Sequence, residues 1–283
     1  MRMVVFGIVV LVLLLAAVQV WRLGDDWRAD KIWRQLAGTA SVDPPPFELA
    51  MLQGLPEPAE RYFTYTIRPG TPLYHVAEID MHGEFGLGNQ QAPNYLPMQA
   101  SQILAPPSGF VWRMKAGNGL MRISGSDAGA GRESWTRFWL LGILPVARAG
   151  FDGDHARSAY GRLIAEAAIW TPAALLPGPG VSWQGLDENR AVVTFRHGDL
   201  AQKVEITVAK DGQPTQVLLS RWSNANPEKI FQEQPFGGSL SEFRDFGGYR
   251  LPGRVEAGNF FGTKDYFAFF TVEIDAIRFV GGK

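Results

Sequence analysis

The side chains best suited to bind a metal in this sequence are its histidines and the acidic residues around them. His75 and His82 are seven positions apart, so on one strand they point to opposite faces and cannot share a metal ion. The face of His82 also carries three carboxylates, Glu78, Asp80 and Glu84. A polar row of this kind is typical of a strand face in contact with water. We therefore predict no metal site.

A second acidic segment, residues 152–155 with the sequence Asp-Gly-Asp-His, lies just before an expected helix. It lacks the third acidic residue and the distal glutamate of a calcium loop, so we predict instead that Asp154 caps the helix. Arg162 and Glu166 are four residues apart, which is typical of an ion pair on a helix surface. Arg157 is the candidate contact for the head group of a ligand, with the Arg162 and Glu166 pair as an alternative.

Sequence motifs of the common catalytic sites are absent. The sequence contains no G-x-S-x-G, S-x-x-K or H-E-x-x-H motif, and the glycines at positions 83, 86 and 88 have the wrong order for a dinucleotide-binding loop. We therefore predict no cofactor and favour a non-catalytic protein. A hydrolase whose catalytic residues are dispersed in the sequence is the third alternative.

The overall charge and the absence of cysteine exclude further classes of protein. The chain has 27 basic and 28 acidic residues, for a formal net charge of −1, which is not the charge of a nucleic-acid-binding protein. Without cysteine there is no disulfide, no thiolate nucleophile and no lipid anchor on a cysteine. Hydrophobic residues make up 46% of the chain and charged residues 19%, as in a folded protein.

The N-terminal segment has the composition of a membrane-spanning helix. From Met3 to Val20 only Gly7 and Gln19 are not apolar. A helix of this length spans about 27 Å, just enough to cross the hydrocarbon core of a bilayer. Trp21 and Arg22 follow immediately, where interfacial anchors are expected.

A cleaved signal peptide is the alternative to a retained anchor. Cleavage after Ala17 would place Leu15 at the −3 position, where a small residue is required. We therefore predict that residues 1–23 form a single-pass anchor in a bacterial inner membrane. Basic residues after the span favour a cytoplasmic domain, but large domains are translocated largely regardless of such charges, and we expect the domain on the extracytoplasmic side.

The rest of the chain divides into a connecting segment and one β-rich domain. Residues 24–54 are predicted to contain a juxtamembrane helix, over 25–36, and a stiff linker, over 38–46, that ends in three prolines. Residues 55–283 are predicted to form the domain, which begins with a short helix opened by Leu-Pro-Glu-Pro.

Alternating apolar residues and glycine-rich turns predict a mainly β domain with a covering helix. We expect about ten antiparallel strands in a strongly curved sheet, or half-barrel, because an open twisted sheet rarely holds more strands without curling. The helix is predicted near residues 156–176, with an apolar stripe on one face and Arg162 and Glu166 on the opposite face. The expected strands include 109–116, 132–141, 190–196, 199–208, 214–222, 239–246, 249–261 and 266–280.

Several short motifs spread over residues 55–280 resemble a bacterial family of membrane-anchored proteins of unknown function. The layout is also similar, at the level of fold, to half-barrels of the lipoprotein-carrier type, whose members hold acyl chains beneath a helical lid. The first resemblance implies no activity, and the second implies a fold but does not establish a function. The motifs are Leu55-Pro56-Glu57-Pro58, Gly109-Phe110-Val111-Trp112, Arg157-Ser158-Ala159, Gly161-Arg162 with Glu166, Trp170-x-Pro172, Leu175-Leu176-Pro177, Gly180-Val181-x-Trp183, Arg221-Trp222, Pro235-Phe236-Gly237-Gly238 and Gly248-Tyr249-x-x-Pro252.

The resulting hypothesis is an envelope protein that binds a lipid or another apolar ligand in the half-barrel without catalysis. The alternative is a membrane-anchored interaction or scaffold module whose sheet is filled by a solid core. The two differ in cavity volume, since a solid core leaves no room for an acyl chain. The candidate ligand-lining residues are Phe110, Trp112, Met114, Tyr160, Leu163, Ile164, Tyr266, Phe270, Val272 and Ile274.

Overall fold

The structure is a computed structural model, and it describes residues 2–131 and 133–281. Thirteen strands form one antiparallel sheet in the order β6-β5-β4-β3-β2-β1-β13-β12-β11-β10-β9-β8-β7. The helices are α1 (Arg2–Ala37), α2 (Glu57–Thr66) and α3 (Gly153–Trp170), with 3-10 turns η1 (Leu49–Leu52), η2 (Gly119–Met121) and η3 (Pro172–Leu175). The strands are β1 (Ala77–Asn89), β2 (Ala92–Ala105), β3 (Gly109–Ala116), β4 (Ile123–Ala130), β5 (Glu133–Leu140), β6 (Leu144–Gly150), β7 (Val181–Gly185), β8 (Arg190–His197), β9 (Leu200–Val208), β10 (Pro214–Ser223), β11 (Gln232–Phe246), β12 (Tyr249–Asn259) and β13 (Phe267–Phe279).

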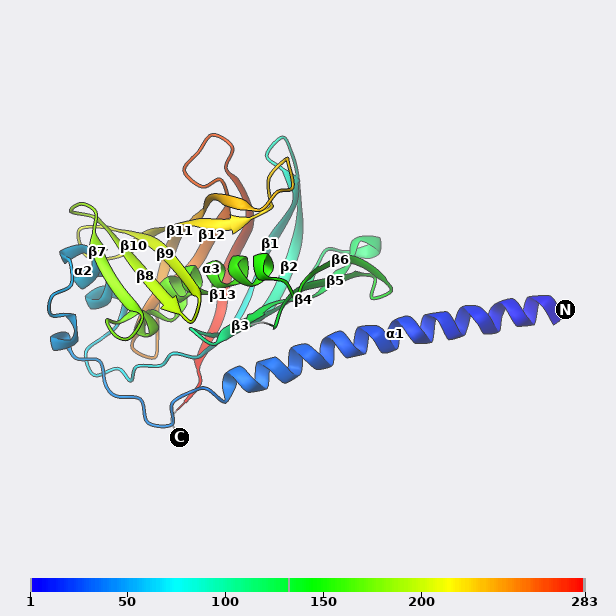
Figure 1. Ribbon diagram of the computed structural model, residues 1–283, viewed down its shortest axis with the longest axis horizontal. Coiled ribbons are helices and arrows are strands. Elements are labelled where there is room, and N and C mark those ends of the chain that lie inside the picture. The colour runs from blue at the N-terminus through cyan, green and yellow to red at the C-terminus, as the bar shows by residue number, and fades with distance from the viewer. Residues whose placement is uncertain (1, 132, 282–283) are drawn as a thin grey trace.

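The predicted fold class is confirmed, because the sheet is open, curved and antiparallel and a helix packs on it (Figure 1). The sheet has thirteen strands where we expected about ten. Strands β2, β6 and β7 were not foreseen, and β11 begins at Gln232, seven residues before the expected start at 239. The reason in β11 is that Pro235, Gly237 and Gly238 weaken the local strand signal, while pairing with β10 and β12 supplies the missing stabilisation.

The two halves of the sheet meet where the first and last strands pair. β1 and β13 are antiparallel neighbours, with Ala77 opposite Phe279 at one end and Phe85 opposite Phe270 at the other. Strands β1 to β6 make up one half of the sheet, with β6 at its edge, and strands β7 to β13 make up the other half, with β7 at its edge. The β1–β13 pair therefore lies near the middle of the sheet, although its partners are far apart in the sequence (Figure 1).

Helix α3 lies on the concave face, inside the curve of the sheet, mainly against β9 and β10 (Figure 1). Its side chains Tyr160, Leu163 and Ile164 are buried, as the apolar stripe predicted. The cap prediction was wrong by two residues, because Asp152 accepts the hydrogen bond from the backbone N–H of His155 at 2.7 Å. Asp154 instead accepts a hydrogen bond from Nε1 of Trp222 at 2.8 Å, a partner that lies 68 positions further along the chain.

Helix α1 is continuous, with an N-terminal half that extends beyond the domain and a C-terminal half that packs on the outer face of the sheet (Figure 1). Ala29, Ile32 and Leu36 are buried there, in a cluster that also contains Val111 of β3 and Trp135 of β5. The alternation along β3 thus sends Val111 toward α1, whereas neighbouring side chains of the same strand face α3.

A buried aspartate fixes the C-terminal half of α1 to the sheet. Asp25 is 6% exposed and accepts hydrogen bonds from Arg137 at 2.9 Å and from Nε1 of Trp139 at 3.1 Å. The guanidinium of Arg148 forms a further ion pair with the same carboxylate. Because both carboxylate oxygens have cationic donors, the charge is compensated in a place with little water.

Replacing a buried apolar residue of α3 by a charged one should unfold the domain far more readily than the same change at the surface. We expect Leu163→Asp to lower the free energy of unfolding by about 3–5 kcal/mol, because the carboxylate would be buried without a partner. Leu186→Asp is the matched control, since Leu186 is 45% exposed, and it should change stability by less than about 0.5 kcal/mol. Urea denaturation of the two variants measures both values, and similar losses would show that α3 is not packed on the sheet.

Removing the charge of Asp25 should loosen α1 from the sheet. We expect Asp25→Asn to cost about 2–4 kcal/mol, because two arginines lose their carboxylate partner. Asp30→Asn is the control, since Asp30 pairs with Arg113 at the surface and such pairs contribute about 0.2–1 kcal/mol. Amide hydrogen exchange over residues 25–37 should accelerate in the first variant, and equal protection in both variants would contradict the role given to Asp25.

Candidate functional site

A cavity of about 220 Å³ lies between α3 and the concave face of the sheet. The strands contribute aromatic side chains to its wall, among them Phe85, Trp112 and Phe236, and α3 contributes Ile169 and Trp170. Gly237 and Gly238 of β11 also line it, and a side chain at either position would collide with a backbone oxygen of a neighbouring strand. Apolar walls with a few polar groups are the usual composition of a small-molecule site.

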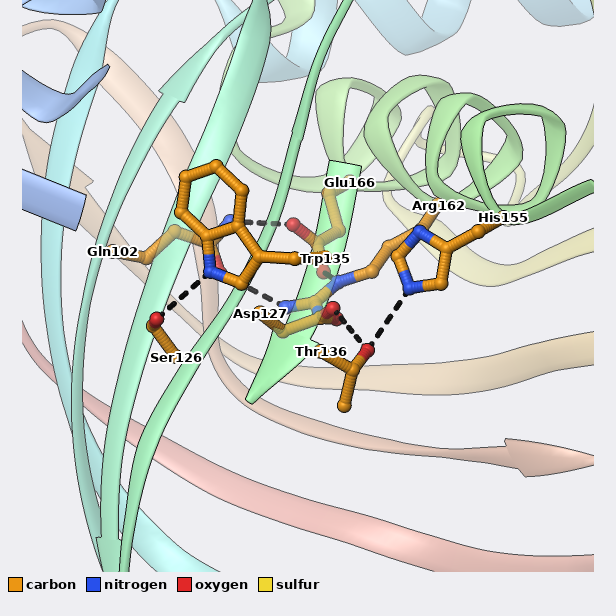
Figure 2. A network of polar contacts seen from close by, with 8 residues as sticks. All are labelled: Gln102, Ser126, Asp127, Trp135, Thr136, His155, Arg162 and Glu166. Carbon is orange, nitrogen blue, oxygen red and sulfur yellow. Dashed lines mark hydrogen bonds and ion pairs between the residues drawn. The ribbon is translucent and has the colours of Figure 1, made fainter. Parts of the chain in front are cut away.

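A polar cluster centred on Arg162 of α3 occupies one side of this cavity (Figure 2). Arg162 forms ion pairs with Asp127 of β4 and Glu166 of α3, each at 2.6 Å, and donates to the amide oxygen of Gln102 at 3.2 Å. Gln102 in turn donates to Glu166. Burial alone would lower the pKa of Arg162, but the adjacent carboxylates of Glu166 and Asp127 raise it above its ordinary value. Arg162 therefore stays charged.

The network continues from Asp127 to the start of α3 (Figure 2). The hydroxyl of Thr136 donates its single hydrogen to Asp127 at 2.7 Å and lies 3.1 Å from Nε2 of His155. Because that hydrogen is already used, His155 must be the donor to Thr136, and its Nε2 carries the proton. The cluster thus connects strands β2, β4 and β5 with the first turn and the middle of α3.

Arg221 of β10 is the second arginine of the cavity and differs from Arg162 in having no carboxylate partner. Among the described residues it forms no ion pair and no side-chain hydrogen bond, and its Nε is buried without a partner. Its guanidinium lies 4.8 Å from the ring centre of Phe236. Burial and the neighbouring charge of Arg162 lower the pKa of Arg221 to about 10.

Two tryptophans of the cavity wall also have an N–H group without a partner. The Nε1 atoms of Trp112 and Trp170 are buried and make no hydrogen bond with the described residues. Together with Arg221, three side chains of the wall therefore carry an unused donor. An unpaired buried donor costs roughly 1–3 kcal/mol relative to a paired one.

The prediction that Arg162 and Glu166 form an exposed pair was wrong. Their side chains are only 13% and 12% exposed, and they face the sheet and not the solvent. Arg162 and Glu166 do form the ion pair that their i,i+4 spacing predicts. Their buried position depends on Asp127, which lies on a strand of small residues without apolar alternation. The sequence signal that could have found the site is the presence of a second arginine, Arg221, on an inward-facing strand position.

The structure places the predicted ligand-lining residues in different surroundings. Trp112 and Phe270 line the cavity, whereas Tyr266 lies in the loop before β13 and contacts Phe261. Arg157 is outside the cavity, where it pairs with Glu233 and stacks on Trp222. The remaining predicted residues are buried in the core around the cavity, namely Phe110, Met114, Tyr160, Leu163, Ile164, Val272 and Ile274. Their role in ligand binding stays a prediction.

Neither metal chemistry nor nucleophilic catalysis follows from the arrangement of side chains. Over residues 2–131 and 133–281, no group of three or more histidine and acidic side chains is placed to hold a metal ion. His82 contacts Asp275 and Glu273 of the neighbouring strand, and Asp80 pairs with Arg278, so the polar row on β1 forms exposed cross-strand pairs.

Comparison with known proteins identifies a family and a set of distant structural neighbours. The family model described as Family of unknown function (DUF6544) matches residues 45–271. No curated protein is a significant match to the chain. The resemblance to a family of unknown function inferred from the sequence motifs is thereby confirmed.

Three solved structures are similar to this chain at low sequence identity. A LolA superfamily protein from Nitrosomonas europaea is 10% identical, with 81% of this chain and 92% of that chain covered and a TM-score of 0.40. A putative outer membrane lipoprotein-sorting protein domain from Vibrio parahaemolyticus is 11% identical, with coverage of 82% and 91% and a TM-score of 0.37. A DUF1329 family protein from Desulfovibrio piger is 9% identical, with coverage of 73% and 86% and a TM-score of 0.34.

The two cavity arginines should respond in opposite ways to the same substitution. Arg162→Met would leave Asp127 and Glu166 buried without their cation, and we expect a loss of about 3–5 kcal/mol in the free energy of unfolding. Arg221→Met would remove a buried cation that has no partner, and stability should stay within about 1 kcal/mol of the native protein or rise. Denaturant unfolding of both variants measures the difference, and equal losses would mean that Arg221 is compensated like Arg162.

Proposed function

We propose that this chain, which belongs to the DUF6544 family of unknown function, is a non-catalytic envelope protein that binds a small acidic amphiphile beneath α3. The single observation that carries the proposal is the apolar cavity whose wall contains Arg221 without a carboxylate partner. An apolar wall favours the hydrocarbon part of a ligand, and a half-buried guanidinium without an ion pair favours its anionic group.

The cavity volume limits the size of the bound group. A water molecule occupies about 30 Å³ in the liquid, so a cavity of about 220 Å³ has the volume of roughly seven water molecules. The volume is below the range of about 300–1,000 Å³ usual for drug-sized ligands. A complete long acyl chain therefore exceeds the space, whereas a medium-chain acid, or the end of a longer lipid, matches it.

The acidic group is specified by the donors of the wall. Arg221 offers a charged guanidinium, and Trp112 and Trp170 each offer one buried N–H group. None of these three side chains carries an acceptor that would suit a basic ligand. A carboxylate or a phosphate would accept hydrogen bonds from the guanidinium of Arg221.

We further propose that α1 remains attached as the membrane anchor and that the domain lies outside the cytoplasm, at the bacterial inner membrane. The N-terminal part of α1 is long and apolar enough to cross a bilayer, a property that a signal peptide shares. The C-terminal part of the same helix belongs to the fold, because Asp25, Ala29 and Ile32 are buried against the sheet, so a retained anchor would be fixed directly to the domain. The proposed location brings the cavity close to a source of amphiphiles.

A scaffold with a solid core is the second candidate. It is favoured by the small volume of the cavity and by the complete burial of most predicted lining residues, such as Phe110 and Ile164. A scaffold would present its strand edges or loops to an envelope protein and would bind no amphiphile. The two candidates therefore give different results in a binding experiment.

Titration with octanoate and with octanol should separate the two candidates. We expect the full-length protein in zwitterionic nanodiscs to bind octanoate with a saturable stoichiometry of about one, and octanol at least about tenfold more weakly, since a charged hydrogen bond contributes roughly 1.5–3 kcal/mol. Isothermal titration calorimetry measures both affinities, with empty nanodiscs to subtract partitioning into lipid.

Variants then identify the site. Arg221→Gln should remove the preference for octanoate over octanol, whereas Arg157→Gln, the matched change at an exposed arginine outside the cavity, should leave it intact. Ala165→Leu should weaken both ligands, because Ala165 lines the cavity and a larger side chain would fill it. Folded protein that takes up neither ligand would favour the scaffold.

A further inference from the structure

Two neighbouring hairpin tips expose apolar side chains beside α1. The connection between β3 and β4 carries Leu120, which is 81% exposed, and Met121. The connection between β5 and β6 carries Leu141 and Ile143, and Leu144 follows at the start of β6 with 57% exposure. A cluster of exposed apolar side chains on a protein surface marks a site of contact with another protein or with a membrane.

One of these tips is bonded to α1 at the end of its apolar run. The side-chain amide of Gln19 donates to the backbone oxygen of Gly142 at 2.9 Å. Gly142 has a φ of 69°, a backbone conformation that favours glycine, and it lies against the guanidinium of Arg22. Gln19 is the second-last residue of the apolar run from Met3 to Val20. The tip therefore lies level with the point where that run ends.

A groove between this tip and the outer face of the sheet is lined by cations. Its volume is about 740 Å³, and Arg22, Lys115 and Arg122 line it together with His82. No aspartate or glutamate is among its described lining residues. A second groove further along α1, by contrast, contains Asp26, Asp30 and other acids among its basic residues. Of these two grooves, the one nearest the apolar run thus has basic side chains and no carboxylate in its lining.

We propose that both hairpin tips enter the surface of the lipid bilayer and that the cationic groove binds the phosphate groups of anionic phospholipids. The inference rests on the proposed membrane span of α1 and is independent of the ligand beneath α3. A span that ends near Val20 puts Gly142 at the boundary between hydrocarbon and head groups. Leucine and isoleucine then contact acyl chains, and arginine and lysine contact phosphate, which is the usual division at this depth.

Single cysteines provide the test of depth, because the natural chain has none. Ile143→Cys and Leu120→Cys report on the tips, and Leu186→Cys and Ile230→Cys are controls at exposed apolar residues outside both tips. Each full-length variant is labelled with the environment-sensitive dye NBD and reconstituted into vesicles of phosphatidylcholine and phosphatidylglycerol. We expect blue-shifted emission and quenching by brominated acyl chains at the two tips only.

Flotation of the vesicles checks the premise, since the protein must float with the lipid if α1 spans the bilayer. Protein that fails to float would overturn the proposal, and so would tip labels whose emission and quenching match those of the controls. Octanoate binding measured on the same preparations is unaffected by either result, so failure here is distinct from failure of the proposed ligand site.

Lipid selectivity tests the groove. Native mass spectrometry of the full-length protein released from vesicles with equal amounts of the two lipids should show bound phosphatidylglycerol enriched at least about threefold. The double variant Lys115→Gln, Arg122→Gln should bind the two lipids equally, whereas Arg190→Gln, Lys210→Gln, at residues outside the groove, should keep the enrichment. Equal binding of both lipids by the natural chain would overturn the assignment of the groove to anionic head groups.

Discussion

The pairing of Arg162 with two carboxylates is the interaction on which the arrangement of the domain depends. A helix laid on the concave side of a curved sheet must bury its inner face, and the inner face of α3 carries a full positive charge. Asp127 compensates that charge from the sheet, and Glu166 compensates it from the helix itself. The pairing fixes the position of α3 over the strands, and the cavity is the space left between the helix and the sheet.

The alternation of side chains along each strand also separates the concave face of the sheet from its outer face. Along β3, Trp112 faces the cavity and α3, whereas Val111 and Arg113 face α1. The concave side thus encloses an apolar space with unused N–H donors nearby, and the outer side supports the C-terminal half of α1. A substitution at an even-numbered position of β3 therefore affects the concave side of the sheet, and one at an odd-numbered position affects the outer side.

The curved antiparallel sheet and its covering helix were predictable from the sequence, because both depend on local patterns. Phe110, Trp112 and Met114 share one face of a strand whose other face carries Arg113 and Lys115, and Tyr160, Leu163 and Ile164 recur with helical spacing. The polar cluster was not predictable, because its members come from separate strands and from α3. Arg162 and Arg221 look alike in the sequence, and only the position of Asp127 makes one a compensated charge and the other an unpaired one.

The pairing of β1 with β13 makes completion of the fold a late event. These strands are separated by almost the whole domain, so the entropy of closing that loop opposes their association until the last strand is available. During synthesis, the six strands from β1 to β6 emerge long before β13, and the edge of β1 that pairs with β13 has no partner until then. An unpaired central edge invites association with other chains. The edge of β1 therefore stays exposed for a time that depends on how soon β13 is synthesised. A chaperone that covers strand edges during that time would protect the chain from association.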